Sequence, residues 1–373
     1  MIDYFNLNHL NKIQLNQVIS FFKKNFPGNK KKLQKHFSID LKNNKKHKWT
    51  LAYFRNNLCG AYLIKSNVMN YQGIKLKILG TSYIAVDKKF QKFGIAEYFK
   101  NKLFKLSNKH DFILGFARKK MDGYWVPYNF VGITDFGVLN IDPLKIKIYN
   151  PIKKVKIINF KKKYLTKINK IYKINDQFIT GNLVRTISDF KKYFKINPLK
   201  KVKVFTLNNM FIGYMILQNN IIIEIRINPK YYKESSYSIK EYFLNRSIEN
   251  VEFKTNLNDP FLIYLSQFSH QISTRYFYEG GHVIRIVNIR KLLDKLSPVL
   301  KKKLTGHGIN GLSVSYEGIF IVFRNKKIKF KFLKEINVDL ITKLIFGIIP
   351  IRNSKLEVLF GNTKIQFPQL DHF

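Results

Sequence analysis

The most constraining stretch of the sequence runs from Tyr83 to Ala96 and reads YIAVDKKFQKFGIA. Residues 83–86 form a short apolar run of β-forming residues, which is typical of a buried strand. After a short basic turn, apolar residues recur at helical spacing over 97–106. The stretch therefore predicts a strand, a turn and the start of a helix in immediate succession.

A junction of this kind can bind a phosphate group. The first N–H groups of a helix have no partner within the helix, and the helix dipole is positive at that end, so a pyrophosphate can bind to backbone amides there. Close approach of the backbone requires small residues, which Gly94 and Ala96 provide. Lys88, Lys89 and Lys92 add positive charge. For these residues alone, the alternative interpretation is a solvated lysine-rich turn with one incidental glycine.

The stretch resembles motif A of the GNAT acetyltransferases, Gln/Arg-x-x-Gly-x-Gly/Ala, which stands here as Gln91-x-x-Gly94-x-Ala96. A second apolar strand candidate at 112–117 and an aromatic segment at 123–130 follow in the order of that family. The resemblance implies acetyl-CoA as the co-substrate, with the backbone of Ala85 and Val86 beside the pantetheine arm. It implies a pyrophosphate site around the backbone of Gln91, Lys92, Phe93, Gly94, Ile95 and Ala96.

The overall composition fits a folded intracellular protein. A chain of 373 residues predicts two or three domains, and 45% hydrophobic residues are sufficient for packed cores. The single cysteine, Cys59, excludes an internal disulfide and favours a reducing compartment. No apolar run reaches the ~18 residues of a membrane helix, and the N-terminus does not resemble a signal peptide. We therefore expect a soluble, cytoplasmic protein, and no metal site is expected.

The net charge of +44 has two interpretations. A strongly basic protein can bind nucleic acid or an anionic surface. AT-rich coding also produces abundant Lys, Asn, Ile, Phe and Tyr along a whole chain, and here the lysines are not clustered in one segment. We favour the second interpretation, although such a charge attracts any anionic ligand, CoA included.

The first domain is expected to span 1–150. A helix is expected around 15–22, a hairpin around the turn at 55–57, and a strand at 73–80 leading into the strand at 83–86.

The second domain is expected to span 151–284 and to repeat this order. It has a hairpin within 202–217, a strand at 221–227 and a helix at 237–248. The segment 228–233 before that helix lacks the glycines of the phosphate turn. We expect a second GNAT-like unit without a CoA site; the alternative is an unrelated α+β domain.

The third domain is expected to span 285–373. A strand at 283–289 should lead into it, followed by a helix from 290 to 300, strands within 312–323 and a helix at 338–346. This order resembles the enhanced-intracellular-survival (Eis) type of acetyltransferase, chiefly through the segments 285–293 and 367–373. The resemblance implies an α+β fold class with tandem GNAT folds, the second degenerate, and a small sterol-carrier-like C-terminal domain.

The aromatic segment offers two candidates for the acid that protonates the departing thiolate. The GNAT pattern places a tyrosine four residues before a Gly-aromatic pair. If Asn129-Phe130 takes the place of that pair, Trp125 stands at the tyrosine position with Tyr124 beside it. If Gly132-Ile133 takes it, Tyr128 stands there. Packing in the core or in a pocket wall is the alternative role for each ring.

The C-terminus offers the candidates for a base. The Eis resemblance implies the terminal carboxylate, here that of Phe373, which has an ordinary pKa of ~3.5 against ~10 for an amine. A water relay or burial would improve that match. His372 is a rival base, whereas Asp371 is expected to anchor the tail. Asp87 and Glu97 are expected in the turn and on the helix surface.

These observations predict an acetyl-CoA-dependent N-acetyltransferase acting on a small-molecule or sugar amine, with the acceptor bound between the first two domains and the tail. There are two alternatives: a Fem-type aminoacyl-tRNA-dependent transferase, and a non-enzymatic nucleic-acid or envelope-binding protein on an inactive GNAT fold. The intact motif at 91–96 argues against the first alternative, whereas the lack of one unambiguous acid is the best support for the second. The Eis resemblance also implies a homo-oligomer.

Overall fold

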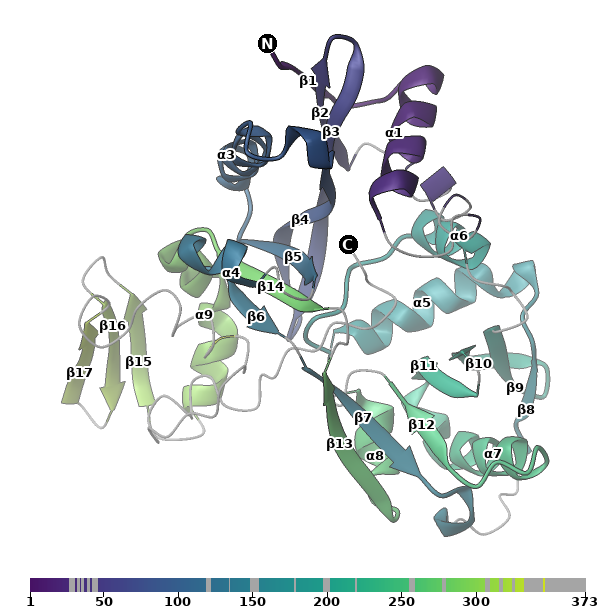
Figure 1. Ribbon diagram of the computed structural model, residues 1–373. Coiled ribbons are helices and arrows are strands. Elements are labelled where there is room, and N and C mark those ends of the chain that lie inside the picture. Colours follow the sequence, from purple (N-terminus) through teal and green to yellow (C-terminus); the bar gives the residue numbers. More distant parts are fainter. Residues whose placement is uncertain are drawn as a thin grey trace.

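The computed structural model describes residues 1–26, 31, 34, 37–38, 41, 46–118, 122–133, 135–147, 154–177, 179–196, 202–218, 220–254, 259–276, 280–305, 309–314, 318–323, 326–331 and 345. These residues form two seven-stranded sheets, one three-stranded sheet and helices packed against them (Figure 1). The expected mixed α and β fold class is confirmed.

The first sheet has the strand order β1-β2-β3-β4-β5-β14-β6. Its strands are β1 (Asp3–Leu7), β2 (His47–Phe54), β3 (Asn57–Tyr71), β4 (Ile74–Val86), β5 (Phe112–Arg118), β14 (Gly280–Ile286) and β6 (Val131–Ile133). The strands expected at 73–80 and 83–86 are parts of one continuous strand, β4. An alternating stretch and an apolar stretch can follow each other along a single strand, so the change of pattern did not mark a strand end. The hairpin at 55–57 is confirmed, with left-handed backbone at Arg55 and Asn56.

Two helices cover opposite faces of this sheet. Helix α1 (Lys12–Asn25) packs Val18 and Phe22 against one face, which we name the α1 face. Helix α3 (Ile95–Ser107) packs Phe99 and Leu103 against the other, the α3 face. Alternate residues of each strand contribute to the two faces, as a strand requires.

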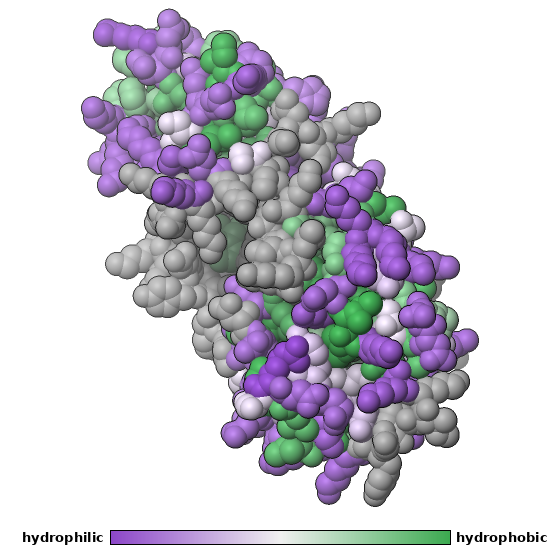
Figure 2. Space-filling view, turned by 90° about the vertical axis from the view of Figure 1, so that its right-hand side faces the viewer, coloured by the Kyte–Doolittle hydropathy of each residue, from purple (hydrophilic) through white to green (hydrophobic). Residues whose placement is uncertain are grey.

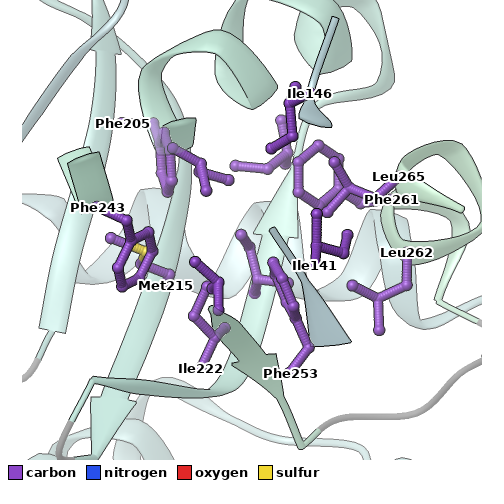
Figure 3. Packing of buried hydrophobic residues seen from close by; sticks show 14 of the residues in the cluster. Ile141, Ile146, Phe205, Met215, Ile222, Phe243, Phe253, Phe261, Leu262 and Leu265 are labelled. Atoms are coloured by element: carbon purple, nitrogen blue, oxygen red, sulfur yellow. The ribbon is translucent and has the colours of Figure 1, made fainter. Parts of the chain in front are cut away.

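The second sheet has the order β13-β7-β12-β11-β10-β9-β8. Its strands are β13 (His270–Tyr276), β7 (Asp135–Ile141), β12 (Val251–Phe253), β11 (Ile221–Ile227), β10 (Met210–Gln218), β9 (Val202–Leu207) and β8 (Lys156–Asn159). Helices α5 (Leu165–Asp176) and α6 (Ile187–Ile196) pack on one face. The core of the other face, against α7 (Tyr232–Leu244) and α8 (Pro260–Leu265), brings together apolar side chains from strands and helices, including Phe205, Phe253 and Phe261 (Figure 3).

The two sheets have the same strand order. Each sheet also contains one strand that, in the sequence, comes directly after the residues of the other sheet. Strands β8 to β12 repeat the order of β1 to β5. In the first sheet β14 lies between β5 and β6, whereas in the second sheet β7 lies between β12 and β13. The units therefore exchange one strand each. The domain bounds 1–150, 151–284 and 285–373 stay predictions, but β7 and β14 pair across the first two of these ranges.

The exchange corrects the interpretation of residues 283–289 as the lead-in to a third domain. Residues 280–286 are a central strand of the first sheet, paired with β5 and β6. Strand periodicity predicts that a segment is extended, but not which sheet it joins.

Beyond β14, helix α9 (Ile289–Thr305) precedes β15 (Ile309–Val314), β16 (Gly318–Phe323) and β17 (Lys326–Lys331). An ion pair of 2.6 Å between Lys295 Nζ and the buried Asp111 carboxylate joins α9 to the first unit. The helix expected at 338–346 lies outside the described residues apart from Ile345, and the sterol-carrier-like fold of this part stays a prediction.

Candidate functional site

The first sheet opens between two parallel strands. Strands β4 and β5 pair only from Ile78 opposite Phe112 to Thr81 opposite Gly115. Beyond that point β4 continues to Val86 and β5 to Arg118 without pairing to each other. We name this gap in the backbone pairing the β4–β5 opening. At its closed end a Cβ on Gly115 would lie 2.5 Å from Thr81 Cγ2, so the close approach of the strands requires a glycine.

A β-bulge lies at the start of the opening. Tyr62 pairs with Ile84 and Leu63 with Ser82, which leaves Tyr83 as the extra residue, with a left-handed φ of 50°. Such a bulge bends the strand and re-aims the residues that follow it.

The free backbone groups at the end of β4 face the opening. Asp87 N–H donates to the carbonyl oxygen of Cys59 at 2.9 Å, so this amide points toward β3. Backbone groups alternate in direction along a strand, and the groups of Ile84 and Val86 therefore point away from β3. The backbone of Val86 therefore has the direction expected of it, whereas the backbone groups of Ala85, which pairs with Ala61, point toward β3.

A compact turn connects β4 to α3. The Asp87 carboxylate accepts from Lys89 N–H at 3.1 Å and from Lys24 Nζ at 2.7 Å. The bond from Lys24, followed by that from the Lys89 amide, lowers the pKa of Asp87. Asp87 thus caps the 3-10 turn η1 (Lys88–Phe90), as a turn residue, in agreement with the sequence analysis.

The turn then takes a left-handed conformation at Lys92, with a φ of 71°, and at Gly94, with a φ of 77°, directly before α3 begins at Ile95. The amides of the first helical turn have no intrahelical partner. Among the described residues, the amides of 92–94 also donate no hydrogen bond.

The turn is open to solvent and anchored on one side only. Residues 91–94 are exposed, Ala96 is half-buried and Ile95 is buried in the α3-face core. A Cβ on Gly94 would meet no atom within 4 Å. Open amides, a helix N-terminus and neighbouring lysines together form a site suited to a phosphate or pyrophosphate.

The two acid candidates both lie beside the first turns of α3. Tyr124 belongs to α4 (Asp122–Trp125) and donates from its hydroxyl to the carbonyl oxygen of Ala96 at 3.4 Å. Burial raises the pKa of Tyr124. Tyr128 ends the 3-10 turn η2 (Val126–Tyr128), with its ring centroid 6.2 Å from that of Tyr124.

A buried cation accompanies these tyrosines. Lys100 Nζ lies 3.7 Å from the Tyr128 ring centroid and forms an ion pair with the exposed Glu97. Sequence reasoning did not identify Lys100, since a lysine on a lysine-rich helix gives no signal. Trp125 is buried in the core against Phe130, with ring centroids 4.9 Å apart, so it has a packing role. The base candidates Phe373 and His372, like Asp371, lie outside the described residues.

The second unit retains the strand geometry of the first. Gly213 pairs with Ile227 and Tyr214 with Arg226, in the register in which Gly60 pairs with Val86 and Ala61 with Ala85. The β10–β11 pair also has a register shift, after Ile216.

The second unit lacks the phosphate turn. Asn228 caps the 3-10 turn η6 (Pro229–Tyr231), as Asp87 caps η1, but α7 then begins at once, at Tyr232. Because η1 ends at Phe90 and α3 begins at Ile95, residues 91–94 have no counterpart. That the second unit has no CoA site stays a prediction, and this shorter connection is what the structure shows at the segment 228–233 that lacks the glycines.

Buried charges occupy the position that corresponds to Ala85. There, Arg226 is fully buried and its Nη1 lies 2.5 Å from Asp259 Oδ2. On the same strand, Glu224 accepts from Arg185 Nη1 and from the Tyr214 hydroxyl, each at 2.7 Å. Buried charged side chains therefore line the strand that corresponds to the end of β4.

Comparison with known proteins identifies solved structures with a similar fold. No family model matches the chain, and no curated protein matches its sequence. Solved structures match over nearly the full length. A GCN5-related N-acetyltransferase from Kribbella flavida is 10% identical over 100% of this chain and 99% of its own, with a TM-score of 0.63. One from Anabaena variabilis is 14% identical over 97% of both chains, with a TM-score of 0.62.

Eis1 from Mycobacterium abscessus is 10% identical over 100% of both chains, also with a TM-score of 0.62. The chain therefore has the fold of the GNAT N-acetyltransferases, as the motif at 91–96 predicted. Within the described parts of the chain, no helix has the length and apolarity needed to cross a bilayer.

Proposed function

We propose that the protein is an acetyl-CoA-dependent N-acetyltransferase, in which an amine attacks the thioester directly. The observation that carries this proposal is the open turn at 91–94, located at the N-terminus of α3 and next to the β4–β5 opening. A phosphate site and an extended gap in adjacent positions match the two chemically different parts of CoA, its pyrophosphate and its pantetheine arm.

Each part of the co-substrate has a group to bind it. The amides of Lys92, Phe93, Gly94, Ile95 and Ala96, beside Gln91, would bind the pyrophosphate. The pantetheine arm would pair along the free backbone edge of β4, beside Ala85 and Val86. The Val86 N–H faces the opening, where it can stabilise the oxyanion that forms when the thioester carbonyl is attacked.

Proton transfer completes the reaction. The amine must lose a proton to attack, and the departing thiolate must gain one. Tyr124 and Tyr128 are positioned on the α3 side of the sheet, where the CoA sulfur would leave, and either hydroxyl can supply that proton. The terminal carboxylate of Phe373 and the ring of His372 remain the base candidates from the sequence.

One active site per chain is expected, because the second unit has no counterpart of the turn at 91–94. A cytoplasmic small-molecule or sugar amine as acceptor and a homo-oligomeric assembly are further parts of the proposal. The alternatives that use charged tRNA or bind nucleic acid give no reason for the open turn. On the face in Figure 2, hydrophilic side chains are also spread over both ends of the molecule and do not form one stripe.

The test is thermal stabilisation by acetyl-CoA in wild type and in Gly94→Trp, with Gly73→Trp as the matched control. Gly73 also has a left-handed backbone, with a φ of 87°, but lies in the β3–β4 turn far from α3. Both substitutions carry a similar backbone strain of about 1–2 kcal/mol.

At a ligand concentration 100 times Kd, wild type and the Gly73 variant should gain about 2.7 kcal/mol of stability. Gly94→Trp should gain none, because the indole blocks the approach of the pyrophosphate. Equal stabilisation of both variants would contradict the proposed site.

A further inference from the structure

The exchanged strand β14 places a histidine one strand away from the β4–β5 opening, because β5 lies between β14 and β4. His282 pairs with Phe116, and the neighbouring residue Val283 pairs with Gly115. Gly115 is the last residue of β5 that pairs with β4, so His282 stands at the level where the opening begins.

The His282 side chain lies on the α1 face. Val283 and Ala117 pack in the core of the α3 face, and alternation directs their neighbours, His282 and Phe116, to the opposite side. The two rings contact each other edge to face, with centroids 5.2 Å apart. His282 is only 1% exposed.

A second polar side chain borders the opening on the same face. Ser82 follows the last β4 residue that pairs with β5, and it pairs with Leu63 of the α1-face core. Ser82 is 3% exposed, and its hydroxyl has no hydrogen-bond partner among the residues that the structure describes. A buried hydroxyl without a partner is costly unless a ligand or water completes it.

The two faces of the opening thus carry different chemistry. The α3 face holds the phosphate turn and the two tyrosines, which can bind the co-substrate and donate a proton to its sulfur. The α1 face holds Ser82 and His282, a hydroxyl and an imidazole, which can bind an amine and accept its proton.

We infer that the acceptor amine binds on the α1 face, with its nitrogen beside Ser82, and that His282 is the general base. This inference rests on the proposed function. Neutral His282 takes a proton from the ammonium group, and the nitrogen lone pair then forms the C–N bond to the thioester carbonyl carbon. The C–S bond breaks, and the thiolate takes its proton from a tyrosine on the α3 face. The second proton of the new amide nitrogen then restores that tyrosine through solvent, and His282 releases its own proton to solvent.

Other titratable side chains share this face of the sheet with His282. The described titratable side chains on the same face of the sheet include His47 and Tyr53 of β2, Lys65 and Tyr71 of β3, and Tyr83 of β4. Lys65 is buried and lies with its Nζ 5.0 Å from the Tyr83 ring centroid.

The assignment also gives the strand exchange a function. His282 comes from the strand that follows the second unit, so the first unit contains the co-substrate site but not its base. The active site would be complete only when both halves of the chain are folded together.

The experiment compares acetylation by wild type, His282→Gln and the control His270→Gln, whose ring is exposed on the edge strand β13. The acceptors are hydroxylamine, which is already neutral at pH 7, and the most reactive member of a panel of primary alkylamines. For the alkylamine, His282→Gln should lower kcat about 10²–10³-fold and should remove the loss of rate that wild type shows at mildly acidic pH. The loss with hydroxylamine should be far smaller, and His270→Gln should match wild type.

Acetyl-CoA-induced thermal stabilisation of His282→Gln should equal that of wild type, which shows that the variant is folded and binds the co-substrate. If the variant does not fold, the pH–rate profiles of wild type with the two acceptors decide. A loss of rate at acidic pH with the alkylamine but not with hydroxylamine supports a general base, and identical profiles for the two acceptors overturn the assignment.

An unchanged kcat and pH profile in His282→Gln would overturn the assignment while the proposed function stands. The same holds if removal of Phe373, or His372→Gln, abolishes the acidic loss of rate instead. Failure of wild type to acetylate any amine of the panel would overturn the proposed function and this assignment together.

Discussion

The buried pair of Arg226 and Asp259 should make the second unit sensitive to loss of a single charge. Both side chains are completely buried, and Asp259 also accepts from Phe261 N–H at 2.9 Å as the N-cap of α8. Removing one partner of a buried ion pair leaves the other charge uncompensated, which costs about 3–5 kcal/mol. Loss of an N-cap costs about 1 kcal/mol more.

Three variants separate these two effects. Asp259→Asn keeps a good capping side chain and should lose about 3–5 kcal/mol of unfolding free energy. Asp259→Ala loses the cap as well and should lose about 4–6 kcal/mol by the same reasoning. The double variant Arg226→Met/Asp259→Asn has no uncompensated charge, and it should recover most of the loss.

Urea unfolding followed by circular dichroism measures these differences, and acetyl-CoA-induced stabilisation serves as a control for the first unit. A loss below about 1 kcal/mol in Asp259→Asn would match an exposed pair and would refute the reasoning. A double variant no more stable than Asp259→Asn would also refute it.

Two further predictions concern the first unit. Removing the hydroxyl of the true acid, by Tyr124→Phe or Tyr128→Phe, should lower kcat about 10²-fold or more without weakening acetyl-CoA binding, whereas the other variant should stay near wild type. Because burial raises the pKa of Tyr124, activity that depends on its proton should persist to a higher pH than an ordinary tyrosine allows, then fall as the pH rises further. Gly115→Ala should lose about 1–3 kcal/mol of stability, because its Cβ would lie 2.5 Å from Thr81 Cγ2. Thr81→Ser removes that methyl group and should restore most of the loss in the double variant, as unfolding midpoints would show.

Local sequence patterns predicted the elements of this fold well. The strand, turn and helix around 83–106, the two hairpins and the first helix are where periodicity and turn residues placed them. The turn at 91–94 was predicted from the small residues Gly94 and Ala96 and from the helix start that follows, both of which are local features.

The partners of the strands could not be predicted in this way. Strands β7 and β14 are ordinary apolar segments in the sequence, and their exchange between the sheets depends on contacts far apart in the chain. The positions of Lys100 and His282 depend on the same long-range pairing. A buried lysine or histidine is recognised only when the opposing strand or helix is known.

The most direct test of the account is the stoichiometry of acetyl-CoA binding, measured by isothermal titration calorimetry on the full chain. The account predicts one acetyl-CoA per chain in wild type, because only the first unit has the turn at 91–94, and no binding in Gly94→Trp. Two molecules per chain, or undiminished binding in the variant, would contradict it.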